Sequence, residues 1–292
     1  GALNDAASAK IAAADAAVGP PGPPLTVFFN QDAVIFTFLF FFFPTAAPPR
    51  GVFFWGLSPT RRVLLTFTAT ALLLSINWLA YIWSVVHNHI VDGALGYFMN
   101  PLVNVLLGVF FLRERLRPGQ TIAIVVAAAG VLYMTANAGV LPWVALTLAF
   151  SFSGYALLRK VGELDSFQGL TLETMVLAVP GLAYLLFLET HDGGTFIHGG
   201  WWPTLLLLGA GAITAAPLLL FAAGARRISL STLGILQYTS PTIQFLLAVF
   251  FYGEALTPVR LVGFGLIWTA LMIYTFEGVM TRQRQATLRY AH

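Results

Sequence analysis

Two stretches of the chain decide how the whole sequence is organised. Residues 101–118 read PLVNVLLGVFFLRERLRP, and residues 241–258 read PTIQFLLAVFFYGEALTP. The stretches lie 140 positions apart, and nine of their eighteen positions are identical, including the prolines at both ends and one glutamate. Leucine and phenylalanine match easily between apolar sequences, but a Pro, a Glu and a Pro at one constant offset do not. We therefore interpret the chain as an internal duplication.

Both stretches belong to long apolar runs. The 292 residues are 58% hydrophobic and 9% charged, with a mean hydropathy of +0.81, whereas soluble domains carry about 25% charged residues. A helix needs about 20 apolar residues to cross a membrane. Eight such segments occur, at 63–86, 93–112, 119–138, 141–158, 167–188, 203–225, 230–252 and 260–280, and a weaker ninth covers 33–49.

The runs are continuous and do not alternate with period two, which excludes a barrel of strands. The sequence therefore predicts an all-α integral membrane protein, a polytopic helical bundle with no room for a large soluble domain.

The basic residues alternate along the chain and predict its orientation. They gather at Arg50, Arg61 and Arg62, at Arg113, Arg115 and Arg117, at Arg159 and Lys160, at Arg226 and Arg227, and at Arg282, Arg284 and Arg289. The connections 87–92, 137–142 and 189–202 contain none. The basic ends and the tail 281–292 are therefore expected in the cytoplasm.

An odd number of crossings separates the two copies of the repeat. By the apolar segments the chain crosses five times between Pro101 and Pro241, so the second copy is expected upside down. We assign residues 25–139 to the first repeat and 140–280 to the second. Residues 1–24 carry three charges and a GPPGPP stretch and do not resemble a span. Inverted repeats are typical of secondary transporters, which hold their solute near the midplane; a duplicated protein that moves nothing is the alternative.

Polar residues inside the spans recur at the same offset. They are Tyr97, Asn100 and Asn104 in the first copy and Gln237, Ser240 and Gln244 in the second. The i, i+3, i+7 spacing places each set on one helix face. A buried amide is costly unless paired, so both faces are expected to line a central cavity or to bond between helices. Pro101 and Pro241, which interrupt helical hydrogen bonding, favour the cavity.

Other spans add weaker candidates for solute contact. They are Asn77, Trp78 and Tyr81 on one segment, Ser151 and Tyr155 on another, and the helix-breaking Pro217. Aromatic rings beside amides suit a planar or amphipathic organic solute, although Trp78 could instead anchor the helix at the lipid interface.

Glu173 is the one carboxylate followed by a long uncharged run, residues 174–188. A charged carboxylate inside the membrane is costly, so we expect it to be neutral or paired, and either state makes it a candidate for proton coupling. The alternative is a helix end at the interface. For Glu114 and Glu254 we expect interface or helix-end roles and no part in transport chemistry.

Enzyme chemistry finds little support in the residues. The chain has no cysteine, no ATP-binding or nucleophile motif, and only His87, His89 and Asp92 as a weak metal cluster, so neither cofactor nor metal is expected. An intramembrane enzyme acting on a lipid or isoprenoid would need converging carboxylates or histidines at one depth. That enzyme and a channel remain the alternatives to a carrier.

Several motifs together resemble the RarD-type permeases of the EamA branch of the drug/metabolite transporter superfamily. They are Asn77-Trp78, ALGYFMNPLVNVLLG at 94–108, AFSFSGY at 149–155, Glu173-Thr174, and LSTLGILQYTSPT at 230–242, which adds Tyr238 to the candidates. The resemblance implies a bacterial inner-membrane exporter of metabolites or drugs. It also implies ten helices in two inverted five-helix repeats, cytoplasmic termini and a central cavity. The family name is tied to chloramphenicol sensitivity.

The N-terminal region departs from that family. The family's Trp-Gly motif in the first helix and His-Arg pair in the second are not recognisable in residues 1–60. Nine spans are visible where symmetry predicts ten, so the first helix is expected to be altered or missing, for instance through a shifted reading frame. The expected partners are membrane lipids, a small organic solute and protons, with no nucleic acid.

Overall fold

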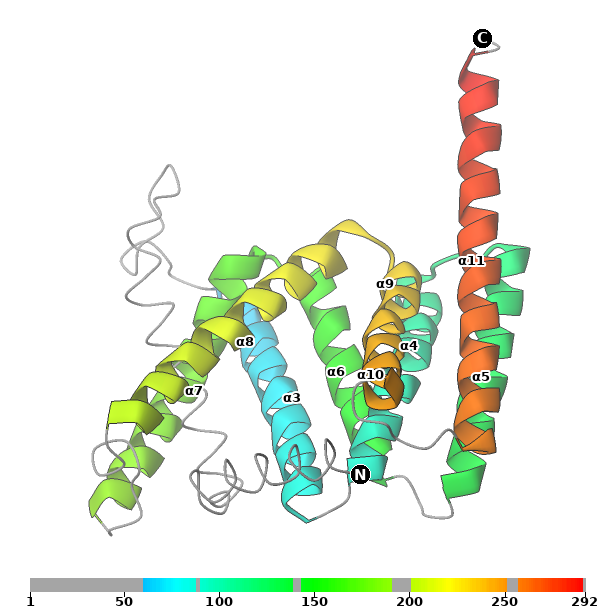
Figure 1. Ribbon diagram of the computed structural model, residues 1–292. Helices are drawn as coiled ribbons and strands as arrows, with labels where there is room; N and C mark the ends of the chain where they lie inside the picture. The colour runs from blue at the N-terminus through cyan, green and yellow to red at the C-terminus, as the bar shows by residue number, and fades with distance from the viewer. Residues whose placement is uncertain (1–59, 88–89, 139–142, 191–200, 251–256, 291–292) are drawn as a thin grey trace.

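A computed structural model describes residues 60–87, 90–138, 143–190, 201–250 and 257–290. These residues form helices joined by short connections, without a strand among them. The helices are α3 (Arg61–Val86), α4 (Ile90–Leu112), α5 (Pro118–Ala138), α6 (Trp143–Val161), α7 (Ser166–Thr190), α8 (Trp201–Arg227), α9 (Leu230–Gln237), α10 (Thr239–Phe250) and α11 (Pro258–Tyr290). The all-α prediction is confirmed for this part of the chain (Figure 1). Residues 1–24, the segment 33–49, His89 and Glu254 lie outside it.

Five of the described helices have segments long and apolar enough to cross a membrane. They are Arg61–Val86, Ala94–Leu112, Pro118–Asn137, Trp143–Val161 and Pro258–Thr281. Their outer faces carry large apolar side chains such as Phe110, Val125 and Phe276, each more than 60% exposed. An apolar exterior of this extent fits a lipid surface and not water.

The offset of the repeat also appears in the starts of the helices. Helix α3 begins at Arg61 and α8 at Trp201, α4 at Ile90 and α9 at Leu230, and α5 at Pro118 and α11 at Pro258. Each pair is separated by the same 140 residues that relate the two quoted stretches.

The helix ends that carry arginines gather on one side of the molecule. In Figure 1 the start of α3 and the ends of α4, α6 and α8 all lie at the upper side. Helix α4 ends on the side where α9 begins, so the two helices run in opposite directions. The last turns of α11 project beyond the other helices on this basic side.

The apolar segment 230–252 is not one helix, contrary to the sequence prediction of a single span. It is divided at Tyr238 into α9 and α10. Pro241 has no N–H, and its ring crowds the carbonyl four residues earlier, that of Gln237. At the break, the Tyr238 N–H bonds to the carbonyl three residues earlier, that of Ile235, at 3.2 Å. Helices α4 and α8 continue through Pro101 and Pro217, so the predicted breaks at these two prolines are wrong.

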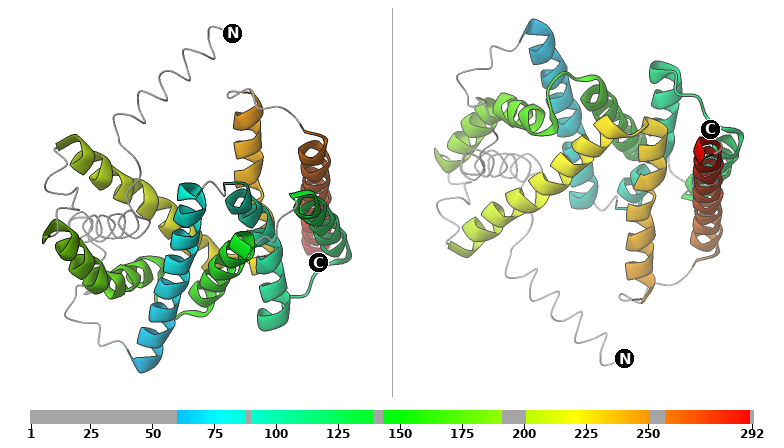
Figure 2. Two further views of the ribbon diagram at one scale, coloured as in Figure 1. Left: turned by 90° about the horizontal axis from the view of Figure 1, so that it is seen from below. Right: turned by 90° about the horizontal axis from the view of Figure 1, so that it is seen from above.

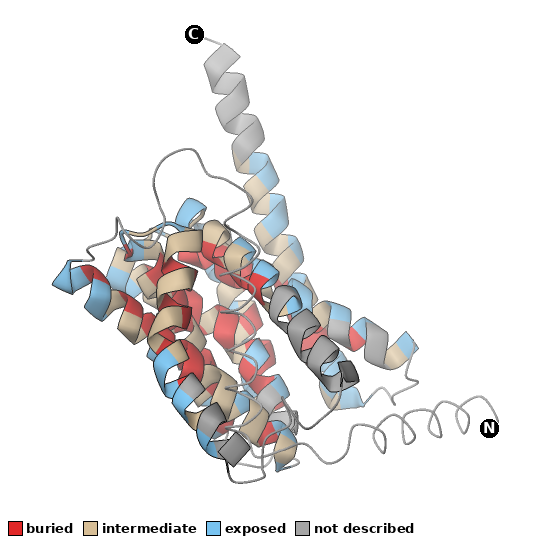
Figure 3. Cartoon of the chain, turned by 90° about the vertical axis from the view of Figure 1, so that its left-hand side faces the viewer, coloured by how far each residue is buried: buried red, intermediate tan, exposed pale blue. Residues whose placement is uncertain are grey.

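The two largest apolar clusters of the described residues join most of the helices. One joins α4, α5, α9, α10 and α11 around Phe98, Ile235, Phe245 and Phe264, and the other joins α3, α6, α7 and α8 around Leu74 and Leu218. Figure 2 shows α5 and α11 side by side at one edge and α7 and α8 toward the other. Buried residues concentrate on the inner faces of the helices, as Figure 3 shows.

Candidate functional site

A cavity of about 860 Å³ lies between α3, α4, α6, α8 and the broken pair α9–α10. It brings together most of the residues predicted for solute contact. Those in its wall are Asn77, Trp78, Tyr81, Tyr97, Asn100, Pro217, Gln237, Ser240 and Pro241. The break after Gln237 therefore lies in the cavity wall, where irregular backbone in a membrane protein is tolerated.

The cavity occupies the half of the molecule away from the arginine-bearing ends. Tyr81 and Ile82 lie near the end of α3, Tyr97 near the start of α4, and Leu148 near the start of α6. Each of these helix ends is opposite to an end that carries basic residues. Phe221 of α8 lines the cavity at its end nearest the basic side.

The described residues of the wall are uncharged. Aromatic rings provide much of the surface, and Tyr81 and Tyr97 meet edge to face with their ring centroids 5.9 Å apart. Asn77, Asn100 and Gln237 add amide groups. Such a wall can hold a planar or amphipathic organic molecule by stacking and by a few hydrogen bonds.

The amides of the wall also bond between helices. Asn77 Nδ2 donates to the Leu148 carbonyl at 2.9 Å and to Ser151 Oγ at 3.0 Å. Ser153 Oγ donates to Asn100 Oδ1 at 2.8 Å. The sequence left two roles open for these amides, lining a cavity or bonding between helices. In the structure the same amides do both.

Four other predicted residues, Asn104, Ser151, Tyr155 and Tyr238, lie outside the wall. Asn104 is buried and donates to Gln237 Oε1 at 2.5 Å, and Tyr238 is buried with its hydroxyl 3.3 Å from the Phe98 carbonyl that accepts its hydrogen bond. Ser151 and Tyr155 are also buried, and the side chain of Gln244 lies outside the described residues. The buried side chains of Asn104, Ser151, Tyr155 and Tyr238 support the wall from behind.

Phe152 and Phe221 form part of the wall and were not predicted from the sequence. Their ring centroids lie 4.8 Å apart, and Tyr155 stacks on Phe221 at 6.3 Å. The chain contains 25 phenylalanines, so no local signal distinguishes these two. The three rings form an aromatic layer on the basic side of the cavity.

Beyond the aromatic layer lies a buried ion pair. Arg159 Nη1 is 3.6 Å from Glu173 Oε1, and both side chains are only 1% exposed. The hydroxyl groups of Thr70 and Tyr155 lie beside the carboxylate. Arg159 Nη2 donates to the Ser166 carbonyl at 2.6 Å, and the guanidinium lies 5.5 Å from the Phe67 ring centroid.

This geometry bears on both residues of the pair. Glu173 is not an interfacial helix end, because it is buried two turns into α7 with a cationic partner. Arg159, grouped from the sequence with Lys160 at a basic helix end, is buried inside the protein. Gly169 makes room for it, since a Cβ at that position would collide with the guanidinium.

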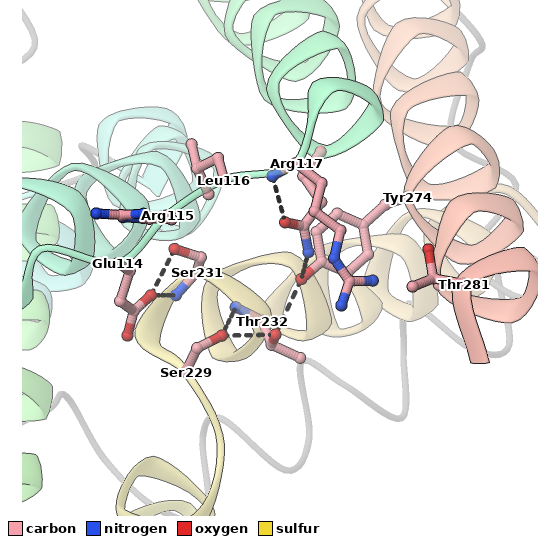
Figure 4. Close-up of a pocket in the computed structure, with 11 residues that line it drawn as sticks. Glu114, Arg115, Leu116, Arg117, Ser229, Ser231, Thr232, Tyr274 and Thr281 are labelled. Carbon is pink, nitrogen blue, oxygen red and sulfur yellow. Dashed lines mark hydrogen bonds between the residues drawn. The ribbon is translucent and has the colours of Figure 1, made fainter. Parts of the chain in front are cut away.

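At the basic end, hydrogen bonds join the first half of the chain to the second. Glu114 accepts three hydrogen bonds from the first turn of α9. The two from Ser231 are drawn in Figure 4. Gln120 Nε2 donates to Tyr274 Oη at 3.2 Å, and Tyr274 Oη lies 2.9 Å from Thr232 Oγ1. These contacts border a smaller cavity of about 400 Å³.

Comparisons with known proteins point to one family. The sequence model of the EamA-like transporter family matches residues 141–276. Protein RarD of Streptomyces exfoliatus is 43% identical over 235 residues, which cover 79% of this chain and 74% of that protein. Protein RarD of Escherichia coli (strain K12) is 43% identical over 77% of this chain and 76% of its own length.

The chain belongs to the RarD-type permeases of the EamA transporter family. The uncharacterized transporter YojE of Bacillus subtilis (strain 168) is 46% identical over 74% of this chain and 72% of that protein. A solved crystal structure shares the fold, with a TM-score of 0.61 at 18% identity, covering 91% of this chain and 92% of that one. This RarD-type permease is therefore a membrane transporter, and its apolar helices and bacterial relatives indicate a multi-pass protein of the bacterial inner membrane.

Proposed function

We propose that this RarD-type permease is a secondary active transporter that exports a small organic metabolite or drug by alternating access. The observation that carries the proposal is the cavity of about 860 Å³, whose described wall is uncharged and rich in aromatic and amide groups. A solute that fits it is neutral or amphipathic, with a planar part that stacks against Tyr97 or Trp78. Metals and cofactors have no place in the proposal.

Alternating access is supported by the opposite directions of α4 and α9–α10, which fit two inverted repeats. We assign the five helices of each repeat to one moving half, and place the arginine-rich ends and the C-terminal tail in the cytoplasm. With this orientation the cavity faces outward. The contacts of Glu114 and of Gln120 with the second half keep the cytoplasmic side closed.

For inward opening, the aromatic layer of Phe152, Tyr155 and Phe221, which lies wholly in the second half, has to move away from α3 and α4 of the first half. This layer lies between the cavity and the Arg159–Glu173 pair. We propose that Glu173 carries the coupling proton, since protonation would release Arg159 from its anionic partner. A change in that pair would reach the layer directly through Tyr155, whose hydroxyl lies beside the carboxylate.

A screen of solutes on everted membrane vesicles, with and without a proton gradient, tests the transport proposal. The relative named chloramphenicol-sensitive protein RarD from Pseudomonas aeruginosa, 33% identical, makes chloramphenicol one probe to include. We expect saturable, gradient-dependent uptake of at least one organic solute into vesicles that contain the protein.

Three results would contradict the proposal. Flux that rises linearly with solute concentration and ignores the gradient indicates a channel. Chemical conversion of an added lipid or isoprenoid indicates an enzyme. Uptake equal to that of vesicles without the protein excludes transport of the solutes tested, and Glu173→Gln with unchanged gradient dependence excludes the proton role.

A further inference from the structure

Glu114 makes a dense set of contacts between the two halves of the chain. Arg113, with a positive φ of 54°, turns the chain at the end of α4 and directs Glu114 toward α9. The Glu114 carboxylate accepts a hydrogen bond from Leu230 N at 2.7 Å. It also accepts hydrogen bonds from Ser231 N at 2.9 Å and Ser231 Oγ at 2.6 Å (Figure 4). A carboxylate at a helix N-terminus makes strong, charge-assisted hydrogen bonds.

Helix α9 does not need Glu114 in order to begin. Its own N-cap, Ser229, accepts a hydrogen bond from Thr232 N at 3.1 Å. The Glu114 bonds therefore serve to hold α9 against α4. Gly108 leaves space for this carboxylate, because a Cβ there would lie 2.7 Å from Glu114 Oε2.

The other end of α9 forms part of the solute cavity. The helix has eight residues and is about 12 Å long. Its last residue, Gln237, is in the cavity wall and accepts the hydrogen bond from Asn104. Gly234 packs in between against the Pro101 carbonyl. A short, rigid helix held at its start transmits any displacement of that start to Gln237.

We propose that Glu114 is a positioning residue that sets the place of α9, and through it of Leu236 and Gln237, in the solute cavity. This proposal rests on the proposed transport function. It makes Glu114, which lies outside the solute cavity, a determinant of solute specificity. Solute affinity would then depend on a carboxylate that does not border the solute.

The natural chain has no cysteine, which makes single-cysteine reporters straightforward. Leu236→Cys places a thiol on α9 in the cavity wall, where Leu236 is 56% exposed. Ile82→Cys places a matched thiol in the same cavity on α3. The measurement is the rate at which a charged methanethiosulfonate modifies each thiol in the purified full chain, with and without Glu114→Ala.

Glu163→Ala is the matched control, because it also removes one carboxylate. Glu163 lies at the same basic end and pairs at 3.8 Å with the exposed Arg62, away from α9. We expect Glu114→Ala to change the Leu236→Cys rate about tenfold, the factor that corresponds to one charge-assisted hydrogen bond. The Ile82→Cys rate and both rates in Glu163→Ala should stay within about twofold of the parent, since exposed ion pairs contribute little.

Ser231→Ala keeps both backbone bonds to Glu114 and should shift the Leu236→Cys rate in the same direction by less, which tests the proposal even if Glu114→Ala does not fold. Unchanged Leu236→Cys rates in both variants would overturn the proposal, as would equal changes at both thiols. The readout needs no solute. Altered labelling of Leu236→Cys in a protein that transports nothing would thus refute the proposed function and leave the positioning role intact.

Discussion

At the scale of single residues, the Arg159–Glu173 pair is the least ordinary feature of the molecule. Two opposite charges, each 1% exposed, lie inside a part of the protein where charge is expensive. Their separation of 3.6 Å leaves the pair held by attraction and by its surroundings, without a tight direct hydrogen bond. Removing one partner of such a pair strands the other charge.

Single and double substitutions separate the two charges. We expect Arg159→Met and Glu173→Gln each to destabilise the protein by about 3 to 5 kcal/mol, the usual cost of an uncompensated buried charge. The double variant should recover most of this loss, because no buried charge remains. Thermal unfolding in one detergent measures all three against the parent, and a double variant whose losses simply add would show that the two residues act independently.

Sequence reasoning reached only one member of this pair. Glu173 was found because a long uncharged run follows it. Arg159 sits beside Lys160 at a helix end, the pattern of a cytoplasmic cluster, and the turn between α6 and α7 that brings it to Glu173 has no sequence signal of its own. Only the structure shows why residue 169 is a glycine: the Arg159 guanidinium occupies the space that a Cβ there would need.

At the scale of helices, the contact between α4 and α9 joins the two halves of the chain beside the cavity. The two helices approach most closely where Gly234 faces Pro101, and a Cβ at position 234 would lie 2.5 Å from the Pro101 carbonyl oxygen. That approach allows Asn104 to reach Gln237 at the edge of the cavity.

Glycine substitutions compare this contact with an open position. We expect Gly234→Ala to destabilise by about 1 to 3 kcal/mol, because the added methyl group pushes α9 away from α4. Gly265→Ala in α11 has no atom within 4 Å of the new Cβ and should stabilise by about 0.5 to 1 kcal/mol through helix propensity. Thermal unfolding of the two variants side by side measures the difference, and equal effects would show that the α4–α9 approach is not tight.

The helices themselves were largely predictable, but which of Pro101, Pro217 and Pro241 would accompany a break was not. Apolar runs placed the ends of most described helices to within a few positions, but α11 continues to Tyr290, ten residues beyond the run 260–280. The run 230–252 nevertheless divides at Tyr238, whereas α4 continues through the equivalent Pro101. Both prolines remove one backbone donor, so whether the helix breaks depends on the residues packed around each proline. Tyr238, buried with its hydroxyl on the Phe98 carbonyl, holds the interrupted backbone in place.

At the scale of the whole molecule, the internal duplication explains where the cavity forms. Helices related by the 140-residue offset, α4 with α9 and α5 with α11, pack against each other across the two halves. The cavity lies beside the first of these contacts, where both copies carry polar residues next to a proline. The sequence could predict those polar residues, but the aromatic rings opposite them come from α6 and α8 and required the fold.

Transport by purified protein in proteoliposomes, compared between Tyr97→Ala and Tyr133→Phe, tests most directly that the solute uses this cavity. Tyr97 lies in the cavity wall and is 39% exposed, whereas Tyr133 is similarly exposed on α5 away from it. For a solute found in the vesicle screen, we predict that Tyr97→Ala raises KM or abolishes uptake at normal expression, while Tyr133→Phe transports like the parent. Equal uptake by all three proteins would contradict a solute path through the central cavity.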